Sequence, residues 1–153
     1  MVELVKNFNQ NLIQRLVQLE SEAFGIGGMN EWHLVPLIRH GRVYITRSHE
    51  GIVNGLVQYF LDWNNPQKAY MMGVSIAKEY RGKGVGTRFI KETFVALGKE
   101  GIKEVELTVD PKNIAAVKVY QNKLGFQEID FRKNEYGEGE DRLVMNALII
   151  NIE

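Results

Sequence analysis

The stretch Tyr80-Arg81-Gly82-Lys83-Gly84-Val85-Gly86-Thr87 decides how this chain is expected to fold. It follows a predicted strand over residues 70–76 and precedes an apolar helical pattern over residues 89–97, so it joins a strand to a helix. Three glycines at such a junction let backbone N–H groups approach a ligand closely. The first-turn amides of a helix lack internal acceptors and carry the positive end of its dipole. The stretch therefore predicts a pocket for a phosphate or pyrophosphate.

Two cations and a hydroxyl add to this anion pocket, namely Arg81, Lys83 and Thr87. The residue types exclude two nucleotide-binding motifs. A Walker P-loop needs Ser or Thr directly after the Gly-Lys pair, where Gly84 stands, and a dinucleotide fingerprint needs Gly or Ala at the position of Thr87. A nucleotide-dependent enzyme is therefore not expected. The structural alternative is a glycine-rich loop that only connects the strand to the helix.

Hydrophobic periodicity on both sides of this stretch predicts the order β-α-α-β-β-β-α-β-α-β-β. The helices are expected over residues 12–24, 31–39, 89–97 and 116–124, and the main strands over residues 43–46, 52–61, 70–76, 105–109, 126–132 and 143–149. A turn is expected at Asn64-Asn65-Pro66, and Gly98 and Gly101 are expected to end the third helix. Three antiparallel strands followed by a strand-helix-strand unit predict a mixed α/β (α+β) fold with helices on the faces of one sheet.

The composition indicates one ordinary globular domain over residues 1–153. The chain has a mass of 17.5 kDa, 44% hydrophobic and 25% charged residues, and 19 basic against 19 acidic side chains. This balance gives no basic surface for nucleic acid and no polybasic membrane patch. The chain has no cysteine, and its three histidines show no metal-ligand spacing, so no metal is expected. Without a leader or an apolar span, the predicted location is the cytoplasm.

A second motif lies downstream and gives the sequence a family resemblance. Asp110-Pro111-Lys112-Asn113 is followed by Ala116, Tyr120 and Leu124-Gly125-Phe126. Together with Val74-Ser75-Ile76 and the glycine stretch, this spacing resembles the GNAT superfamily of acyl-CoA-dependent N-acetyltransferases. The resemblance implies a largely antiparallel sheet of six to seven strands, with a central splay that holds acetyl-CoA and helices on both faces. The second half of the chain is similar to the ribosomal-protein alanine N-acetyltransferases.

The resemblance also implies a role for each motif residue. Backbone amides of residues 82–87 would bind the pyrophosphate, main-chain groups of Val74 and Ile76 would pair with the pantetheine arm, and Asn113 would hold the acetyl end. Tyr120 would protonate the leaving thiolate as the catalytic acid. The expected cofactor-binding residues are Val74, Ser75, Ile76, Arg81, Gly82, Lys83, Gly84, Val85, Gly86, Thr87, Asn113, Ala116 and Tyr120. Core packing, helix capping and helix termination are alternative explanations for several of them.

The general base is where the sequence departs from the family pattern. Many relatives carry a Glu on the strand before the glycine stretch, where this chain has Met71-Met72, and the ribosomal-protein alanine enzymes carry one on the next strand, at Thr108. Glu22, Asp62 or Tyr70 could still accept the proton of the amine through a water molecule. A solvent-exposed charge or a packed aromatic ring is the simpler explanation for each of these residues. A site without a strong base favours an amine of low pKa, such as an α-amine.

The expected activity is transfer of an acetyl group from acetyl-CoA directly to a primary amine, either a peptide N-terminus or a small molecule. The chain has no cysteine for an acyl-enzyme. The segments expected near the acceptor are residues 24–32, 62–63 and 134–139, in which Trp32, Trp63 and Tyr136 are candidate pocket residues. The alternative is a non-catalytic acyl-CoA-binding regulatory module. Exposed strand edges are also compatible with a homodimer.

Overall fold

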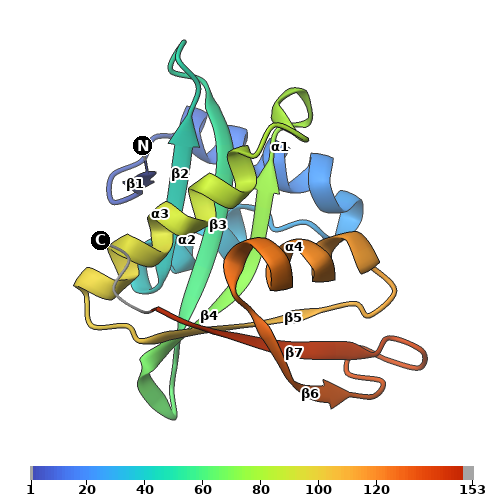
Figure 1. The fold of residues 1–153 in the computed structure, drawn as a ribbon. Helices are drawn as coiled ribbons and strands as arrows, with labels where there is room; N and C mark the ends of the chain where they lie inside the picture. Colours follow the sequence, from blue (N-terminus) through green and yellow to red (C-terminus); the bar gives the residue numbers. More distant parts are fainter. Residues whose placement is uncertain (1, 150–153) are drawn as a thin grey trace. The chain divides into compact units, whose positions relative to one another are not determined.

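The computed structural model describes residues 2–149 and shows a mixed fold of seven strands and four α-helices (Figure 1). The elements are β1 (Val2–Leu4), α1 (Gln10–Phe24), α2 (Glu31–His40), β2 (Arg42–Arg47), β3 (Val53–Asp62), β4 (Asn65–Ile76), α3 (Val85–Lys99), β5 (Glu104–Val109), α4 (Ile114–Leu124), β6 (Gln127–Arg132) and β7 (Arg142–Leu148), with 3₁₀ turns η1 (Gly25–Gly27) and η2 (Lys78–Tyr80). This order confirms the one predicted from the sequence.

The strands follow the sheet order β1-β2-β3-β4-β5-β7-β6. The β1–β2, β2–β3, β5–β7 and β6–β7 pairs are antiparallel, whereas β4 and β5 run parallel. The parallel pair requires a crossover, and α3 supplies it between these two strands. The mixed, largely antiparallel fold class is therefore confirmed.

Two predicted boundaries are wrong. The turn after β3 lies at residues 63–64, because the Asp62 carboxylate accepts a hydrogen bond from the Asn64 amide at 2.7 Å, and β4 consequently begins at Asn65 rather than Tyr70. Helix α3 also continues through Gly98 and ends at Lys99. Gly101, with φ of +90°, lies beyond the end of the helix in a conformation that favours glycine.

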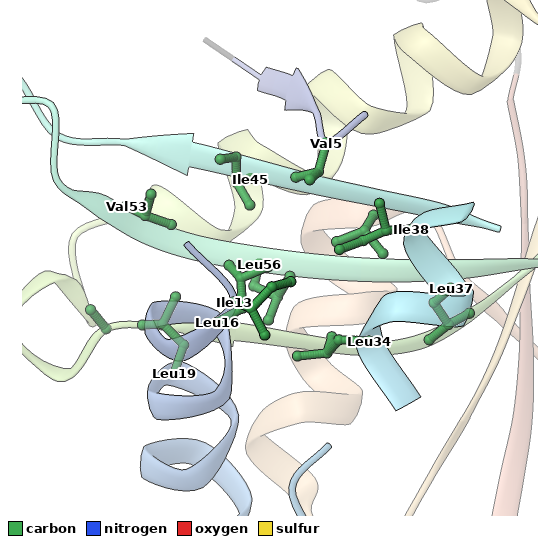
Figure 2. Close-up of a cluster of buried hydrophobic side chains, with 12 residues drawn as sticks. Val5, Ile13, Leu16, Leu19, Leu34, Leu37, Ile38, Ile45, Val53 and Leu56 are labelled. Carbon is green, nitrogen blue, oxygen red and sulfur yellow. The ribbon is translucent and has the colours of Figure 1, made fainter. Parts of the chain in front are cut away.

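The chain divides into two compact units, one of residues 1–60 and 71–93 and the other of residues 61–70 and 94–153. The first unit has its core between helices α1 and α2 and strands β2 and β3 (Figure 2). Asn9 caps α1 by accepting a hydrogen bond from the Leu12 amide at 2.9 Å. The buried apolar members of this core are Val5, Ile13, Leu16, Leu19, Leu34, Leu37, Ile38, Val43, Ile45, Val53, Leu56 and Ala77.

The N-terminal part of α3 packs on the other face of the same strands. The Tyr59 hydroxyl of β3 bonds to the Thr93 hydroxyl of α3 at 2.7 Å. A Cβ at Gly55 would lie 2.6 Å from the Thr46 methyl and 3.2 Å from the Phe89 ring, so this strand position has no room for a larger side chain. Helices therefore cover both faces of β2 and β3 within the first unit.

The second unit has its own core beneath α4 and the end of α3. The rings of Phe94 and Tyr120 each pack edge-on against Phe126, with centroid distances of 6.0 and 5.5 Å. Inward-facing side chains of β5 and β7 complete this core, namely Val105, Leu107, Val109, Met145 and Ala147. Within residues 2–149, no helix is long and apolar enough to cross a membrane.

Candidate active site

The glycine stretch leaves β4 through η2 and reaches the first turn of α3. Gly82 and Gly84 have φ of +75° and +76°, and a Cβ on either would meet no atom within 4 Å. These two glycines are therefore required by the backbone conformation rather than by crowding. Both are exposed, so the loop presents its main chain to solvent at the start of the helix.

Gly86 has a different role from the two glycines before it. It lies in the first turn of α3, and a Cβ there would lie 3.3 Å from the Ile76 side chain at the end of β4. The small residue lets the helix start close to the strand. The amides of residues 85–87 precede the first intrahelical bond, which the Arg88 amide donates to the Gly84 carbonyl at 3.1 Å. These amides are free of helical acceptors, as an anion site requires.

The two predicted cations of the loop differ in their contacts. The Nε of Arg81 donates a hydrogen bond to the Ile76 carbonyl at 2.8 Å, which ties the start of the loop to the end of β4. The other guanidinium nitrogens keep their donor capacity. Lys83 and Arg81 are both exposed. Arg81 thus has a structural contact in addition to the charge that the sequence analysis emphasised.

The predicted pantetheine strand, Val74-Ser75-Ile76, forms the end of β4. Val74 and Ile76 are half-buried, whereas the Ser75 side chain is only 2% exposed. Among the described residues, the Ser75 hydroxyl has no hydrogen-bond partner. Because Ser75 points into the protein interior, any contact of this residue with a ligand falls to its main chain.

Helix α4 begins with the second sequence motif. The Asn113 side chain caps the helix by accepting a hydrogen bond from the Ala116 amide at 3.2 Å. Asp110 prepares this cap, because its carboxylate accepts from the Lys112 amide at 2.9 Å and its carbonyl from the Asn113 amide at 2.9 Å. The three-residue spacing of Asn113 and Ala116 thus has a structural cause.

Tyr120 lies in α4 beside the helix C-terminus. Its carbonyl accepts hydrogen bonds from the amides of Gly125 and Phe126, and Gly125 is left-handed with φ of +73°. The chain reversal brings the Phe126 ring onto the Tyr120 ring. Burial raises the pKa of the Tyr120 phenol above its usual value, so the group is protonated at neutral pH.

A pair of hydroxyl groups that the sequence analysis treated separately meets in the second unit. The Tyr70 hydroxyl of β4 and the Thr108 hydroxyl of β5 lie 2.9 Å apart. The register pairs Tyr70 with Glu106, which places Thr108 one step further on the same face. The sequence analysis did not predict this contact, because it depends on the register between the two strands.

The aromatic side chains expected near the acceptor are exposed. Trp32 and Trp63 are 80% and 97% exposed, and Tyr136 is 62% exposed. The Arg142 guanidinium carbon lies 4.8 Å from the centroid of the Tyr136 ring, a cation–π contact. All three side chains are accessible to a ligand.

The predicted site residues fall into two groups. Residues 74–87 belong to the first unit, in which β4, the glycine loop and α3 are consecutive. Asn113, Ala116 and Tyr120 belong to the second unit, on one helix. The cofactor-binding and catalytic roles of both groups stay predictions. Among residues 2–149, no three His, Asp or Glu side chains are placed to hold a metal ion.

Known proteins are similar to this chain in sequence. A model of the acetyltransferase (GNAT) family matches residues 10–126. An N-alpha-acetyltransferase of Sulfolobus acidocaldarius is 26% identical over 121 residues, which cover 72% of this chain and 71% of that protein. One of Sulfurisphaera tokodaii is 30% identical over 82 residues, or 53% of this chain. That match spans about half of the relative, 48% of its length.

Solved structures with the same fold cover nearly the whole chain. The ribosomal-protein-S18-alanine N-acetyltransferase of Escherichia coli has a TM-score of 0.78 at 17% identity and covers 100% of this chain and 97% of its own. An aminoglycoside 6'-N-acetyltransferase complexed with coenzyme A has a TM-score of 0.80 at 13% identity, with coverage of 100% and 99%. At these identities the likeness concerns the fold alone.

Proposed function

Because the chain belongs to the GNAT acetyltransferase family, we propose that it transfers an acetyl group from acetyl-CoA to a primary amine. The observation that carries this proposal is the exposed glycine loop at the start of α3, with Gly82 and Gly84 in a conformation that favours glycine. Helix N-termini of this kind bind phosphate groups. Coenzyme A carries a pyrophosphate. The aminoglycoside 6'-N-acetyltransferase with a similar fold was solved in complex with coenzyme A.

In this proposed function, the glycine loop, the end of β4 and Asn113 each contact a different part of acetyl-CoA. Amides of residues 82–87 bind the pyrophosphate, and Arg81 and Lys83 add positive charge at the exposed edge. Main-chain groups of Val74 and Ile76 pair with the pantetheine arm, as a neighbouring strand would. Asn113 holds the acetyl end in addition to capping α4.

Tyr120 acts as the general acid in the proposed reaction. The amine nitrogen forms a bond with the thioester carbonyl carbon, the carbon–sulfur bond breaks, and the phenol donates its proton to the departing thiolate. The nitrogen loses one proton, so the balanced products are an acetylated amine and coenzyme A with a free thiol. The raised pKa of Tyr120 supports this role, because a protonated phenol is available at neutral pH.

An α-amine is the acceptor class that we favour. The positions where many relatives carry a glutamate hold Met71, Met72 and Thr108. Deprotonating a lysine-like amine at pH 7 costs about 4.6 kcal/mol, and an α-amine only about 1.1 kcal/mol. A site without a strong base therefore suits the N-terminus of a peptide better. Two relatives by sequence are named N-alpha-acetyltransferase, which supports the same choice.

The missing glutamate also favours a second candidate function, a regulatory module that binds acyl-CoA without turnover. A panel of peptides and small amines distinguishes the two, with release of coenzyme A and the mass of each acceptor as readouts. Acetylation of at least one amine, at a rate above the uncatalysed one, is the expected result. Binding of acetyl-CoA without turnover across the panel would contradict the enzyme and support the module.

A further inference from the structure

A buried carboxyl in the first unit has no role in the proposed reaction. Glu20 of α1 is only 2% exposed, whereas Glu22 on the same helix is exposed. One of its carboxyl oxygens accepts a hydrogen bond from the side-chain amide of Gln58 in β3, which is fully buried. Acidic side chains are rarely buried to this extent unless they are paired. A carboxyl at this depth therefore indicates a role beyond packing.

The second partner of Glu20 lies in the α1–α2 connection, residues 25–30. The Met29 amide donates a hydrogen bond to the Glu20 carboxyl. The connection also passes close to the helix, because a Cβ at Gly28 would lie 2.7 Å from the Glu20 carbonyl oxygen. The side chain and the main chain of Glu20 thus both contact the end of the connection. We call Glu20, Gln58 and the Met29 amide the Glu20 cluster.

The rest of the α1–α2 connection has few contacts. A Cβ at Gly25 or Gly27 would meet no atom within 4 Å, and the Ile26 side chain is fully exposed. The Met29 side chain packs against the core of the first unit. Segments with few buried apolar contacts open locally at a low free-energy cost. Together with the Met29 side chain, the Glu20 cluster therefore fixes the connection on the rest of the unit.

The Glu20 cluster also adjoins the strand that the proposed function assigns to the pantetheine arm. A Cβ at Gly73 of β4 would lie 3.2 Å from Gln58 Oε1 and 4.0 Å from the ring of Phe24. Gly73 directly precedes Val74-Ser75-Ile76, and Phe24 directly precedes the connection. All of these residues belong to the first unit. Opening of the connection would therefore take place beside the proposed cofactor strand.

The fold favours the neutral form of the Glu20 carboxyl. Burial raises its pKa, and the hydrogen bonds from the Gln58 side chain and the Met29 amide lower it, with a net increase. Among the described residues, Gln58 Oε1 has no hydrogen-bond partner. A half-turn of the Gln58 amide lets this oxygen accept the O–H of the neutral acid. Gln58 can therefore bind Glu20 in either protonation state.

The elements packed around this carboxyl present neutral groups to it. Residues 25–30 contain no titratable side chain, and Gln58 of β3 and Gly73 of β4 are uncharged. The acids nearest to Glu20 along the chain, Glu22 of α1 and Glu31 of α2, are exposed. None of the described groups that shift the Glu20 pKa is charged, so an ionised Glu20 is buried without a paired cation. Such a charge is costly to keep in a dry interior.

We propose that Glu20 is a positioning residue: its neutral form holds residues 25–30 against α1 and β3, and its ionisation releases them. Release lets the carboxylate reach water at a lower cost than unfolding of the unit. The connection is held at low pH and is released as the pH rises through the raised folded pKa of Glu20. An effect of release on acetyl transfer rests on the proposed function, whereas the release itself does not.

Amide hydrogen exchange of the full chain tests the release directly. Protection factors of residues 25–30, corrected for the intrinsic pH dependence of exchange, are compared at pH 5 and pH 8. The protection factor of the Met29 amide is expected to fall about tenfold in the wild type and to stay within about twofold in Glu20→Gln, which cannot ionise. Glu22→Gln changes an exposed acid of the same helix and is expected to behave as the wild type.

Two neighbouring glycines test the close approach of the connection to α1. Neither Gly27 nor Gly28 has a positive φ, so alanine fits the backbone at both positions. Gly28→Ala places a methyl group 2.7 Å from the Glu20 carbonyl oxygen, whereas Gly27→Ala meets no atom within 4 Å. Gly28→Ala is expected to lower the Met29 protection factor about tenfold at pH 5, and Gly27→Ala to leave it within about twofold. Thermal unfolding of both variants checks that they are folded.

Kinetics with one peptide acceptor test the positioning role. The ratio of the acceptor KM of the wild type to that of Glu20→Gln cancels the ionisation of the amine, because both proteins meet the same peptide. Residues 25–30 lie in the segment expected near the acceptor. The ratio is therefore expected to rise about threefold from pH 5 to pH 8, with the Kd for coenzyme A within about twofold in both proteins.

The outcomes separate this inference from the function on which part of it rests. The same pH dependence of protection in the wild type and Glu20→Gln would overturn the release, as would equal protection in Gly28→Ala and Gly27→Ala. A KM ratio that stays constant from pH 5 to pH 8 would overturn the positioning role. Release seen by exchange in a protein that acetylates no amine would overturn the proposed function and the positioning role together, and would support the release.

Discussion

The ring of Phe126 packs edge-on against the ring of Tyr120, with centroids 5.5 Å apart and planes inclined by 68°. The same two residues are joined through the main chain, because the Phe126 amide donates to the Tyr120 carbonyl at 3.0 Å. The phenol is therefore held by its ring and its backbone. A substitution that removes only the hydroxyl therefore leaves the ring packing in place.

The first prediction concerns this hydroxyl. Tyr120→Phe keeps the ring contact with Phe126 and removes only the proton donor, so kcat is expected to fall at least 100-fold, the range typical of a general acid. Steady-state kinetics and a binding titration check this, with an acetyl-CoA Kd expected within about threefold of the wild type. An unchanged kcat would remove Tyr120 from the mechanism.

The second prediction compares two glycines of nearly equal conformation. Gly84 in the loop and Gly51 in the turn after β2 have φ of +76° and +82°, and neither has an atom within 4 Å of its would-be Cβ. Alanine strains the backbone by about 1 kcal/mol at either position. Only Gly84→Ala is expected to weaken coenzyme A binding, by at least tenfold, in a calorimetric titration. Equal affinities of the two variants would argue against the loop as the pyrophosphate site.

The third prediction separates the two roles of Asn113. Asn113→Ala removes the helix cap and is expected to lower the free energy of unfolding by about 1 kcal/mol, whereas Asn113→Asp keeps a capping oxygen and the stability. Denaturant titrations measure both. If Asn113 also holds the acetyl end, Asn113→Asp retains stability but has a lower kcat/KM for acetyl-CoA. Full activity in that variant would leave Asn113 with the capping role alone.

The fourth prediction concerns a buried carboxyl in the first unit. Glu20 is 2% exposed, and burial raises its pKa, although bonds from the Gln58 side chain and the Met29 amide lower it. Folding therefore favours the protonated form. The stability from this group is present below the unfolded pKa of about 4.3 and is lost as the pH rises through the higher folded value.

Glu20→Gln mimics the protonated group, so it is expected to gain in Tm relative to the wild type on going from pH 4 to pH 8. Glu22→Gln, an exposed position on the same helix, is the control and is expected to show no such trend. Thermal melts at several pH values measure the difference. A constant difference between Glu20→Gln and the wild type across this range would contradict the assignment.

Local sequence signals predicted the parts of the fold that local physics decides. The glycines at residues 82 and 84 were identified because they lie between a strand and a helix, where they let backbone amides approach a ligand. Asn113 and Gly125 were identified because caps and helix ends have short-range requirements. The element order followed from hydrophobic periodicity. These features depend on neighbours within a few residues, which a single sequence contains.

Contacts between distant residues were beyond the sequence. The hydrogen bond between Gln58 and Glu20 and the one between Tyr70 and Thr108 each join residues 38 positions apart. The strand start at Asn65 was missed because the Asp62 side chain moved the turn. Pairings of this kind depend on strand register and helix placement, which periodicity alone leaves open.

Binding of coenzyme A to the ligand-free protein is the most direct test of the central claim. A calorimetric titration is predicted to show saturable binding at one site per chain, weakened in Gly84→Ala and retained in Gly51→Ala. A flat titration of the folded wild type, together with an unchanged Tm on addition of coenzyme A, would contradict the account.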